Sequence, residues 1–259
     1  MRGELPGQTI STGGKLDLGF DDEALLFDKE YRCPVCKKPF TMKRVRSDEA
    51  VSDGRDIDLR PRYKNIDVLK YRVIECPACG YAELDKFFSN INSNEAAMLR
   101  ENSAKTDADL YFTGGIRDYE RAYEAYKSAI RCNLIRGAKN SRRGLTALYT
   151  AWLLRSWREA IENKGASVDE SEPMGLPEEE KFLKYALSNF KEAELKENSP
   201  LSEIGEAALA YLIAALLYDQ GEYSEARKHL IKVLNMKHVD RDLRIKAEDL
   251  RDIIGGNDD

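Results

Sequence analysis

The sequence Cys33-Pro-Val-Cys36 returns further along the chain as Cys76-Pro-Ala-Cys79. Two residues between paired cysteines let one tight turn direct both thiolates to the same ion, and a structural zinc ion takes four such sulfurs in a tetrahedron. Gly80 directly follows the second pair, where the turn needs a positive φ. Lys37 takes the equivalent place in the first pair, at the modest cost that a non-glycine residue incurs there. The four cysteines therefore predict a closed tetrathiolate metal site.

Zinc is the expected metal, and iron is the alternative because CPACGY also resembles one half of a rubredoxin site. A thioredoxin-like redox pair needs a βαβ context and a helix after the motif, and neither pair has this setting. Disulfides are not expected, because the chain has five cysteines and its N-terminus lacks the apolar stretch of a signal peptide. The fifth, Cys132, lies in a helical stretch and is interpreted as a small buried hydrophobe.

Short alternating segments around both pairs predict two β-hairpins whose turns are the metal knuckles. Between them, residues 47–68 are polar and include Asp53-Gly54 and Pro61, so a loop is expected there. Residues 28–89 are thus predicted to form a zinc-ribbon-like β domain, preceded by a flexible segment over residues 1–27. Because the ribbon core is small, removal of the metal is expected to unfold it and to leave the rest of the chain largely intact.

Residues 90–259 carry a second pattern, the spacing of small and large residues found in the second helix of a tetratricopeptide (TPR) hairpin. The recurrences are Tyr119, Ala122, Tyr126 and Ala129; Ala186, Phe190 and Ala193; and Gly221, Tyr223, Ala226 and Leu230. The expected helix pairs are 94–112 with 118–136, 140–163 with 178–197, and 202–219 with 222–236, with helix 240–254 as a cap. Three stacked hairpins and a cap bury enough apolar surface for a TPR-like α-solenoid. The predicted fold class is α+β, mostly α.

Three stretches together resemble a bacterial family known only as a domain of unknown function (number 2225). They are LFDKEYRCPVCKKPF at residues 26–40, YRVIECPACGYAELDKFF at residues 71–88, and the helical tail that begins DLYFTGG at residues 109–115. The resemblance runs from residue 26 to near the C-terminus. It implies a bacterial cytoplasmic protein with an N-terminal metal-binding ribbon and C-terminal repeats, and it implies no activity.

Catalytic constellations are not visible in the sequence. Both histidines, His229 and His238, fall in or just after the last repeat, away from any recognised setting of a nucleophile. Gly13-Gly14-Lys15 lacks the upstream glycine of a phosphate-binding P-loop. A closed tetrathiolate leaves no coordination position for water. The chain is therefore predicted not to be an enzyme.

The remaining function is recognition of a partner. A TPR stack presents a concave groove, and its first helices here offer arginine and aromatic residues, which anchor peptides and pair with carboxylates. The predicted partner-binding residues are Arg142, Arg143, Tyr149, Trp152, Arg155, Tyr211, Tyr218 and Asp219. Alternatively, Tyr149 and Trp152 fill the core, and the first two arginines form a solvated helix start. The preferred prediction is a cytoplasmic adaptor or scaffold that binds a protein or peptide.

Charge supports a second interpretation. The net charge is −5, but basic residues gather beside the first knuckle. They are Lys37, Lys38, Lys43, Arg44 and Arg46. Nucleic-acid binding by the ribbon is therefore an alternative, although four thiolates and one divalent ion lower the local charge by two. An iron or thiol redox protein is another. No apolar run approaches the ~18–20 residues of a membrane span, so no membrane contact is expected.

Overall fold

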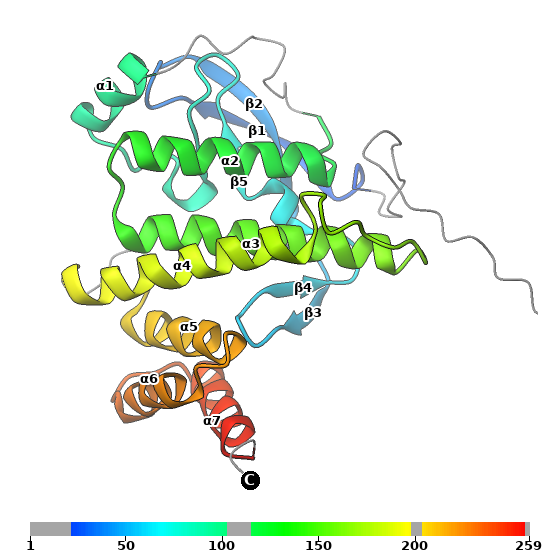
Figure 1. Cartoon of the computed structure of the whole chain (residues 1–259). Coiled ribbons are helices and arrows are strands. Elements are labelled where there is room, and N and C mark those ends of the chain that lie inside the picture. Colours follow the sequence, from blue (N-terminus) through cyan, green and yellow to red (C-terminus); the bar gives the residue numbers. More distant parts are fainter. Residues whose placement is uncertain (1–21, 103–114, 198–203, 257–259) are drawn as a thin grey trace, which may run out of the picture.

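The computed structural model describes residues 22–102, 115–197 and 204–256, and the fold class is α+β, mostly α, as predicted (Figure 1). The helices are α1 (Ser93–Asn102), α2 (Tyr119–Ile135), α3 (Asn140–Glu162), α4 (Leu176–Lys196), α5 (Glu206–Asp219), α6 (Tyr223–Asn235) and α7 (Arg241–Gly256). The strands are β1 (Leu26–Arg32), β2 (Pro39–Val45), β3 (Ser52–Arg55), β4 (Pro61–Tyr63), β5 (Val73–Glu75) and β6 (Ala82–Leu84). Two short 3-10 helices are η1 (Val68–Tyr71) and η2 (Asp85–Phe87).

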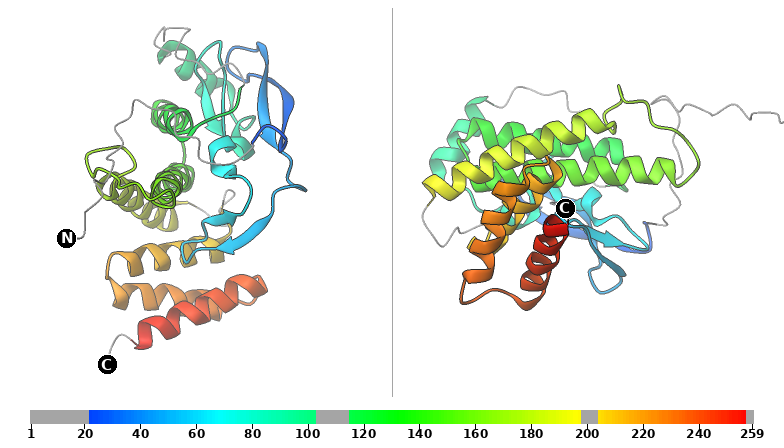
Figure 2. Two further views of the ribbon diagram at one scale, coloured as in Figure 1. Left: turned by 90° about the vertical axis from the view of Figure 1, so that its right-hand side faces the viewer. Right: turned by 60° about the horizontal axis from the view of Figure 1, so that its bottom comes forward.

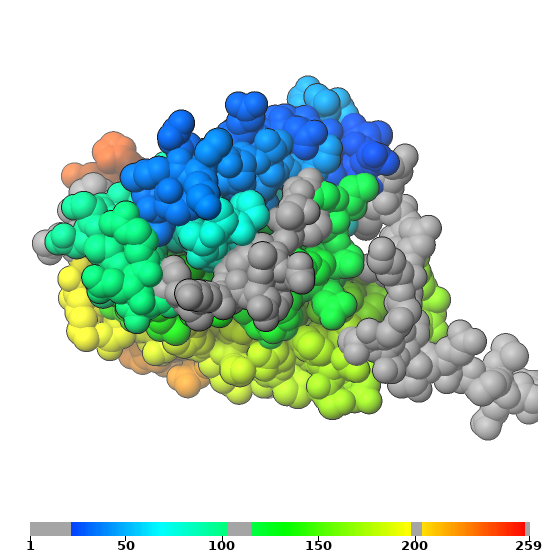
Figure 3. All heavy atoms as spheres, turned by 90° about the horizontal axis from the view of Figure 1, so that it is seen from above, coloured from blue at the N-terminus to red at the C-terminus, as the bar shows by residue number. Residues whose placement is uncertain are grey.

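The strands pair as three antiparallel hairpins, β1 with β2, β3 with β4 and β5 with β6. In the first hairpin Arg32 faces Pro39, and in the third Glu75 faces Ala82, so each cysteine pair lies in the turn that joins its two strands. The prediction that the knuckles are the hairpin turns is confirmed. Figure 3 shows the first hairpin and α1 next to each other on the upper face of the molecule.

Residues 47–68, expected as a loop, instead contain the β3–β4 hairpin, and η1 begins at the end of this stretch. Ser52 pairs with Tyr63 across the hairpin. η1 starts after Asp67, whose carboxylate accepts a hydrogen bond from the Leu69 N–H at 2.9 Å and so caps the first turn. The hairpin extends away from the cysteine knuckles and reaches α5 (Figure 2).

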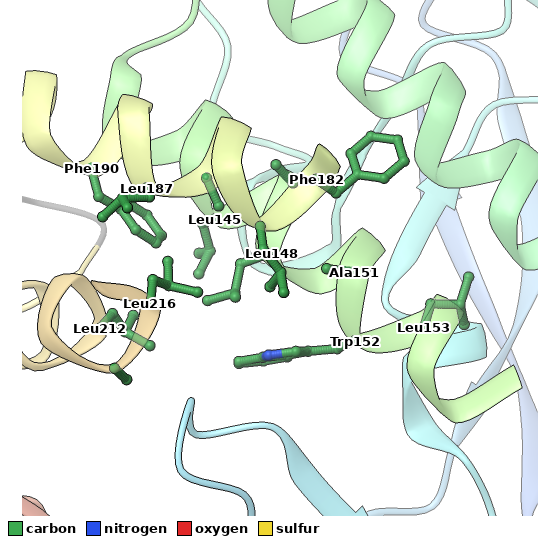
Figure 4. Packing of buried hydrophobic residues seen from close by; sticks show 14 of the residues in the cluster. Leu145, Leu148, Ala151, Trp152, Leu153, Phe182, Leu187, Phe190, Leu212 and Leu216 are labelled. Carbon is green, nitrogen blue, oxygen red and sulfur yellow. The ribbon is translucent and has the colours of Figure 1, made fainter. Parts of the chain in front are cut away.

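The helices form a stack in which α3 lies along α4, and α5, α6 and α7 follow below them (Figure 1). Gly144 allows the close approach of α3 and α4, because a Cβ at this position would lie 2.6 Å from the Phe190 ring. Leucines of α3 and α5 interleave with the aromatic residues of α4 in the shared core (Figure 4). Among the described helices, none has both the length and the apolar character needed to cross a bilayer.

The helical pairs expected over 140–197 and 202–236 correspond to α3 with α4 and α5 with α6, and the expected cap corresponds to α7. For the first expected pair, α1 and α2 are in contact, while residues 103–112 of the predicted helix 94–112 lie outside the described residues. The TPR-like character of the stack stays a prediction.

The hydrophobic core crosses the boundary that the sequence suggests near residue 90. Val73, Leu84 and Phe87 of the ribbon region belong to the same buried cluster as the core residues of α2–α5. The Tyr126 hydroxyl of α2 donates to the Leu69 carbonyl at 3.0 Å, which joins η1 to the helices. The packing of the two regions is therefore continuous. Their division into separate folding units, residues 28–89 and 90–259, stays a prediction.

The described part of the N-terminal segment begins at Asp22. Residues 1–21 of the predicted flexible segment lie outside the described residues. Asp22 is buried, and its carboxylate accepts a hydrogen bond from the Tyr71 hydroxyl at 2.7 Å and pairs with Lys70. Leu26 begins β1. These contacts hold the start of the described chain against η1, and flexibility of the segment over residues 1–27 stays a prediction.

Candidate metal centre

The two cysteine knuckles have the same backbone geometry. The carbonyl of Cys33 accepts a hydrogen bond from the Lys37 N–H at 2.9 Å, and the carbonyl of Cys76 accepts one from the Gly80 N–H at 2.9 Å. Lys37 has a φ of 64° and Gly80 a φ of 69°, so both residues adopt the left-handed conformation that the motif predicts. The Lys37 ammonium donates to the Pro34 carbonyl at 2.8 Å within this turn.

The four sulfurs converge. Cys33 Sγ lies 3.6 Å from Cys79 Sγ, and Cys36 Sγ lies 3.7 Å from Cys76 Sγ, so each close pair joins one knuckle to the other. All four sulfurs lie within 4.8 Å of one another. A tetrahedron with zinc–sulfur bonds of ~2.3 Å has edges of about 3.8 Å. The cluster therefore has the size and shape of a tetrathiolate site.

Electrostatics within the cluster favour a bound cation. Hydrogen bonds from the thiols of Cys76 and Cys79 lower the pKa of Cys33 to about 4. The pKa of each donor is raised in turn, because its ionisation would break the hydrogen bond to Cys33. The four groups cannot all ionise cheaply at close range, and a divalent ion supplies the charge that keeps them as thiolates. Zinc and iron both accept four sulfurs in this geometry.

An apolar shell surrounds the cluster. Cys33 and Cys76 are fully buried, and the Tyr81 and Phe88 rings pack at 5.0 Å between centroids in the same hydrophobic cluster. From α1, the Arg100 guanidinium donates to the Val35 carbonyl at 3.2 Å and holds the first knuckle against the helix. This shell covers Cys33 and Cys76 completely and leaves Cys36 and Cys79 partly exposed, which suits a structural ion near the surface.

The chain matches the family model described as "Uncharacterized protein conserved in bacteria (DUF2225)" over residues 26–254. The chain belongs to this family. The resemblance drawn from the cysteine motifs and the helical tail is thereby confirmed. No curated protein and no solved structure matches the chain.

Cys132 lies beside the second knuckle but outside the four-sulfur set. Its Sγ is 3.5 Å from the Ala82 nitrogen and 3.7 Å from the Gly80 oxygen. The side chain is buried, as the sequence predicts, and burial raises the pKa of its thiol to about 11. The contact with the knuckle was not predicted, because no local sequence signal links α2 to a turn about fifty residues earlier. Cys132 thus joins α2 to the metal centre through packing.

Three of the predicted partner-binding residues contact the chain's own β3–β4 hairpin. The Trp152 indole donates to the Asp58 carboxylate at 2.9 Å, and the Arg155 guanidinium pairs with the same carboxylate at 3.0 Å. The Tyr211 hydroxyl donates to the Ile57 carbonyl at 2.9 Å. In Figure 4 the turn of this hairpin lies beneath the Trp152 ring. These side chains therefore hold the chain's own β3–β4 turn against α3 and α5.

Two other predicted residues, Tyr218 and Asp219, line a cavity of about 590 Å³ between the same turn and α3–α5. Tyr149 packs its ring against Trp152 with centroids 4.9 Å apart, which agrees with the core-filling alternative for this pair. Trp152 itself is buried and has a polar partner at its indole nitrogen.

The two arginines at the start of α3 are placed differently from the expectation. Arg142 is buried, its guanidinium stacks 4.6 Å from the Phe87 ring centroid, and it donates to the Asn90 carbonyl at 3.3 Å. It is therefore neither a groove residue nor solvated, because it joins α3 to the end of the ribbon region. Arg143 is half-buried.

Sequence reasoning missed the residues on the other side of this contact. Asp58 and Arg60 of the hairpin are both buried although they are charged. Arg60 donates to both carboxylate oxygens of Glu159 on α3, at 2.7 and 2.9 Å. The available signal was the run Arg-Asp-Ile-Asp-Leu-Arg at residues 55–60, in which charged residues alternate with large apolar ones. Such alternation indicates a strand or an ordered turn and not a simple polar loop.

Proposed function

We propose that the protein is a non-enzymatic cytoplasmic adaptor, in which a structural zinc centre fixes a ribbon to a TPR-like helical stack that binds a protein or peptide partner. The observation that carries the proposal is the contact of Trp152, Arg155 and Tyr211 with the chain's own β3–β4 turn. Side chains of these types supply most of the binding energy in peptide grooves, and here they already bind a carboxylate and a backbone carbonyl.

The metal's proposed role is structural. Four sulfurs from two knuckles would fill a tetrahedral zinc shell and leave no open position for a water or substrate. Mass spectrometry of protein purified without added metal is expected to find one zinc per chain. A red protein with the visible spectrum of ferric tetrathiolate would instead support the iron alternative.

Affinity capture with matched variants tests the adaptor role. The bait is the full chain, and the control is Asp219→Lys, a substitution at an exposed position on the rim of the groove. We expect a bacterial protein that the wild-type bait enriches and the variant bait does not, followed by a measurable affinity between the two purified proteins. Equal recovery of every protein by the two baits, with no purified pair that binds, would contradict the proposal.

Nucleic-acid binding is the second candidate, and one cavity favours it. Lys29, Arg44, Arg46 and Arg72 line a cavity of about 490 Å³ together with aromatic side chains, including Tyr71. Two of these cations are partly neutralised, because Arg44 and Arg72 pair with one aspartate. Binding through the remaining charges would weaken steeply with salt. Mobility-shift assays at low salt with wild type and Arg46→Glu test this candidate, and the absence of any shift rejects it.

A further inference from the structure

The turn between β3 and β4, residues 56–60, is held in an uncommon backbone conformation. The Asp56 N–H donates to the Arg60 carbonyl at 3.0 Å, and the Leu59 N–H donates to the Asp56 carbonyl at 3.0 Å. Leu59 has a φ of 69°. A bulky residue in this left-handed region is strained by about 1–3 kcal/mol, and such strain persists only where the surroundings fix it. The contacts with the helices fix this turn.

The turn contacts the helices both as a hydrogen-bond acceptor and as a donor. Asp58 accepts from Trp152 and Arg155, and the preceding carbonyl accepts from Tyr211. Arg60 is instead a donor to α3: its guanidinium donates to the Glu159 carboxylate and, at 3.2 Å, to the Ser156 hydroxyl. The groove, defined here as the surface formed by these α3 and α5 side chains, therefore contacts a carbonyl, an acid and a base in the order in which they follow along the turn.

The hairpin combines buried anchoring side chains, Asp58 and Arg60, with exposed residues on either side of them. The Ile57 side chain at the centre of the turn remains 42% exposed, and all of β3 is exposed. The cavity of about 590 Å³ separates part of the turn from α4 and α5. The hairpin contributes no ligand to the metal centre, which the first and third hairpins complete without it. Its position is determined by polar contacts with α3 and α5 and by the packing of Leu59 against the helical core.

We propose that the groove is the binding site for an extended segment of a partner protein with the pattern Asp-x-Asp-x-Arg, and that residues 56–60 occupy it as an internal competitor. The inference rests on the proposed adaptor function and names the chemical class of its partner. The pattern follows from Asp56, Asp58 and Arg60, whose carboxylates and guanidinium meet Arg155 and Glu159 on the helices.

Internal competition has a measurable consequence. A segment tethered to its own groove acts at an effective concentration of about millimolar, so an identical free segment competes poorly. If the free segment binds an open groove with a dissociation constant of about 0.1 mM or below, the wild-type chain should bind it roughly tenfold more weakly, or worse.

The probe is a fluorescein-labelled peptide of residues 52–63, SDGRDIDLRPRY, titrated against the full chain by fluorescence anisotropy. In Asp58→Lys the internal turn is repelled by Arg155, which opens the groove. We expect this variant to bind the peptide at least tenfold more tightly than wild type. Adding Arg155→Ala to the open variant should abolish binding, as should replacing both aspartates of the motif in the peptide by asparagine.

Circular dichroism of each variant establishes that the helices are folded. Should Asp58→Lys not fold, Asp58→Asn is the substitute, because it keeps the side-chain shape and removes only the charge. Its peptide affinity should lie above that of wild type. A folded open variant that binds the peptide no better than wild type overturns the inference.

Two outcomes separate this inference from the adaptor function. A partner that is lost with Asp219→Lys but is captured equally by wild type and Asp58→Lys would uphold the adaptor function and overturn internal competition. Concentration-dependent dimers of wild type that disappear in Asp58→Lys, detected by light scattering, would show that a second copy's hairpin occupies the groove. That result would overturn the assignment to a partner segment.

Discussion

Removal of the metal should unfold the ribbon and also destabilise α2, which revises the expectation from sequence that the helices stay largely intact. The perturbation is Cys76→Ser, or a zinc chelator added to the wild-type chain. Structural zinc sites contribute on the order of 10 kcal/mol, as much as the whole stability of a typical domain. The knuckles have no other source of stability on this scale, so the hairpins that carry them should become disordered.

The consequence for α2 follows from its contacts. Val73 and Leu84 are almost completely buried in the cluster that includes α2, and exposing each costs about 1.5–3 kcal/mol. Two hydrogen bonds should also be lost, from Tyr126 to η1 and from the Arg117 guanidinium to the Val73 carbonyl. Each contributes about 1 kcal/mol to the free energy of unfolding. The sum is several kcal/mol, enough to unfold α2 and too little to unfold the stack of α3–α7, whose own core lies further from the metal.

Far-ultraviolet circular dichroism measures the outcome. α1 and α2 have 10 and 17 residues, so their loss should remove about a quarter of the helical signal of the described helices, and the remaining helices should melt at a lower temperature. Cys132→Ala is the matched control, because it removes a buried sulfur beside the knuckle and should retain one zinc per chain. An unchanged helical signal after verified metal loss would refute the reasoning, as would complete unfolding of the helices.

Three further substitutions test the packing. Gly144→Ala should lower the free energy of unfolding by about 1–3 kcal/mol in denaturant titrations, because its Cβ would overlap the Phe190 ring of α4. The control is Gly255→Ala, whose Cβ meets open space within α7 and which should be neutral or slightly stabilising. Glu83→Gln should cost about 3–5 kcal/mol of unfolding free energy, because the fully buried charge of Arg136 then keeps only the Glu95 carboxylate, at 3.7 Å. A smaller cost for Glu83→Ala would contradict this charge-based explanation. Lys37→Gly should slow zinc loss to a chelator, since it relieves about 1 kcal/mol of strain from the left-handed backbone conformation. Faster loss would show that the contacts of the lysine side chain stabilise the site more than the strain destabilises it.

The metal centre could be predicted because its determinants are local. The spacing of each cysteine pair, the proline after the first cysteine and the residue with positive φ after the second all act within six residues of chain. Two turns of the same backbone geometry then form the site when they face each other. The helices were predicted nearly as well, since small residues such as Ala122, Ala129 and Ala186 lie at the spacing of close helix contacts and are fully buried.

The β3–β4 hairpin could not be predicted in the same way. All four residues of β3 are exposed, so the strand lacks the alternation of buried and exposed residues that identifies strands in sequence. Its turn uses Leu59 where a glycine would have signalled a left-handed residue. Its contacts join residues 94 and 154 positions apart, from Asp58 to Trp152 and from Ile57 to Tyr211. Such contacts depend on the complete fold, and only the charge pattern of the turn hinted at them.

The metal centre and the groove are connected through the chain between the knuckles. A metal held by Cys36 and Cys76 closes residues 37–75 into a loop, and the β3–β4 hairpin lies within it. Loop closure removes conformational freedom from the hairpin, which raises the effective concentration of its turn at the groove. An ion bound by the four cysteines would therefore strengthen the proposed internal competition, although the cysteines lie at the ends of the loop and the turn lies within it. Under the proposed internal competition, metal binding and exposure of the groove would oppose each other, and a partner segment would have to displace a turn whose effective concentration depends on the bound metal.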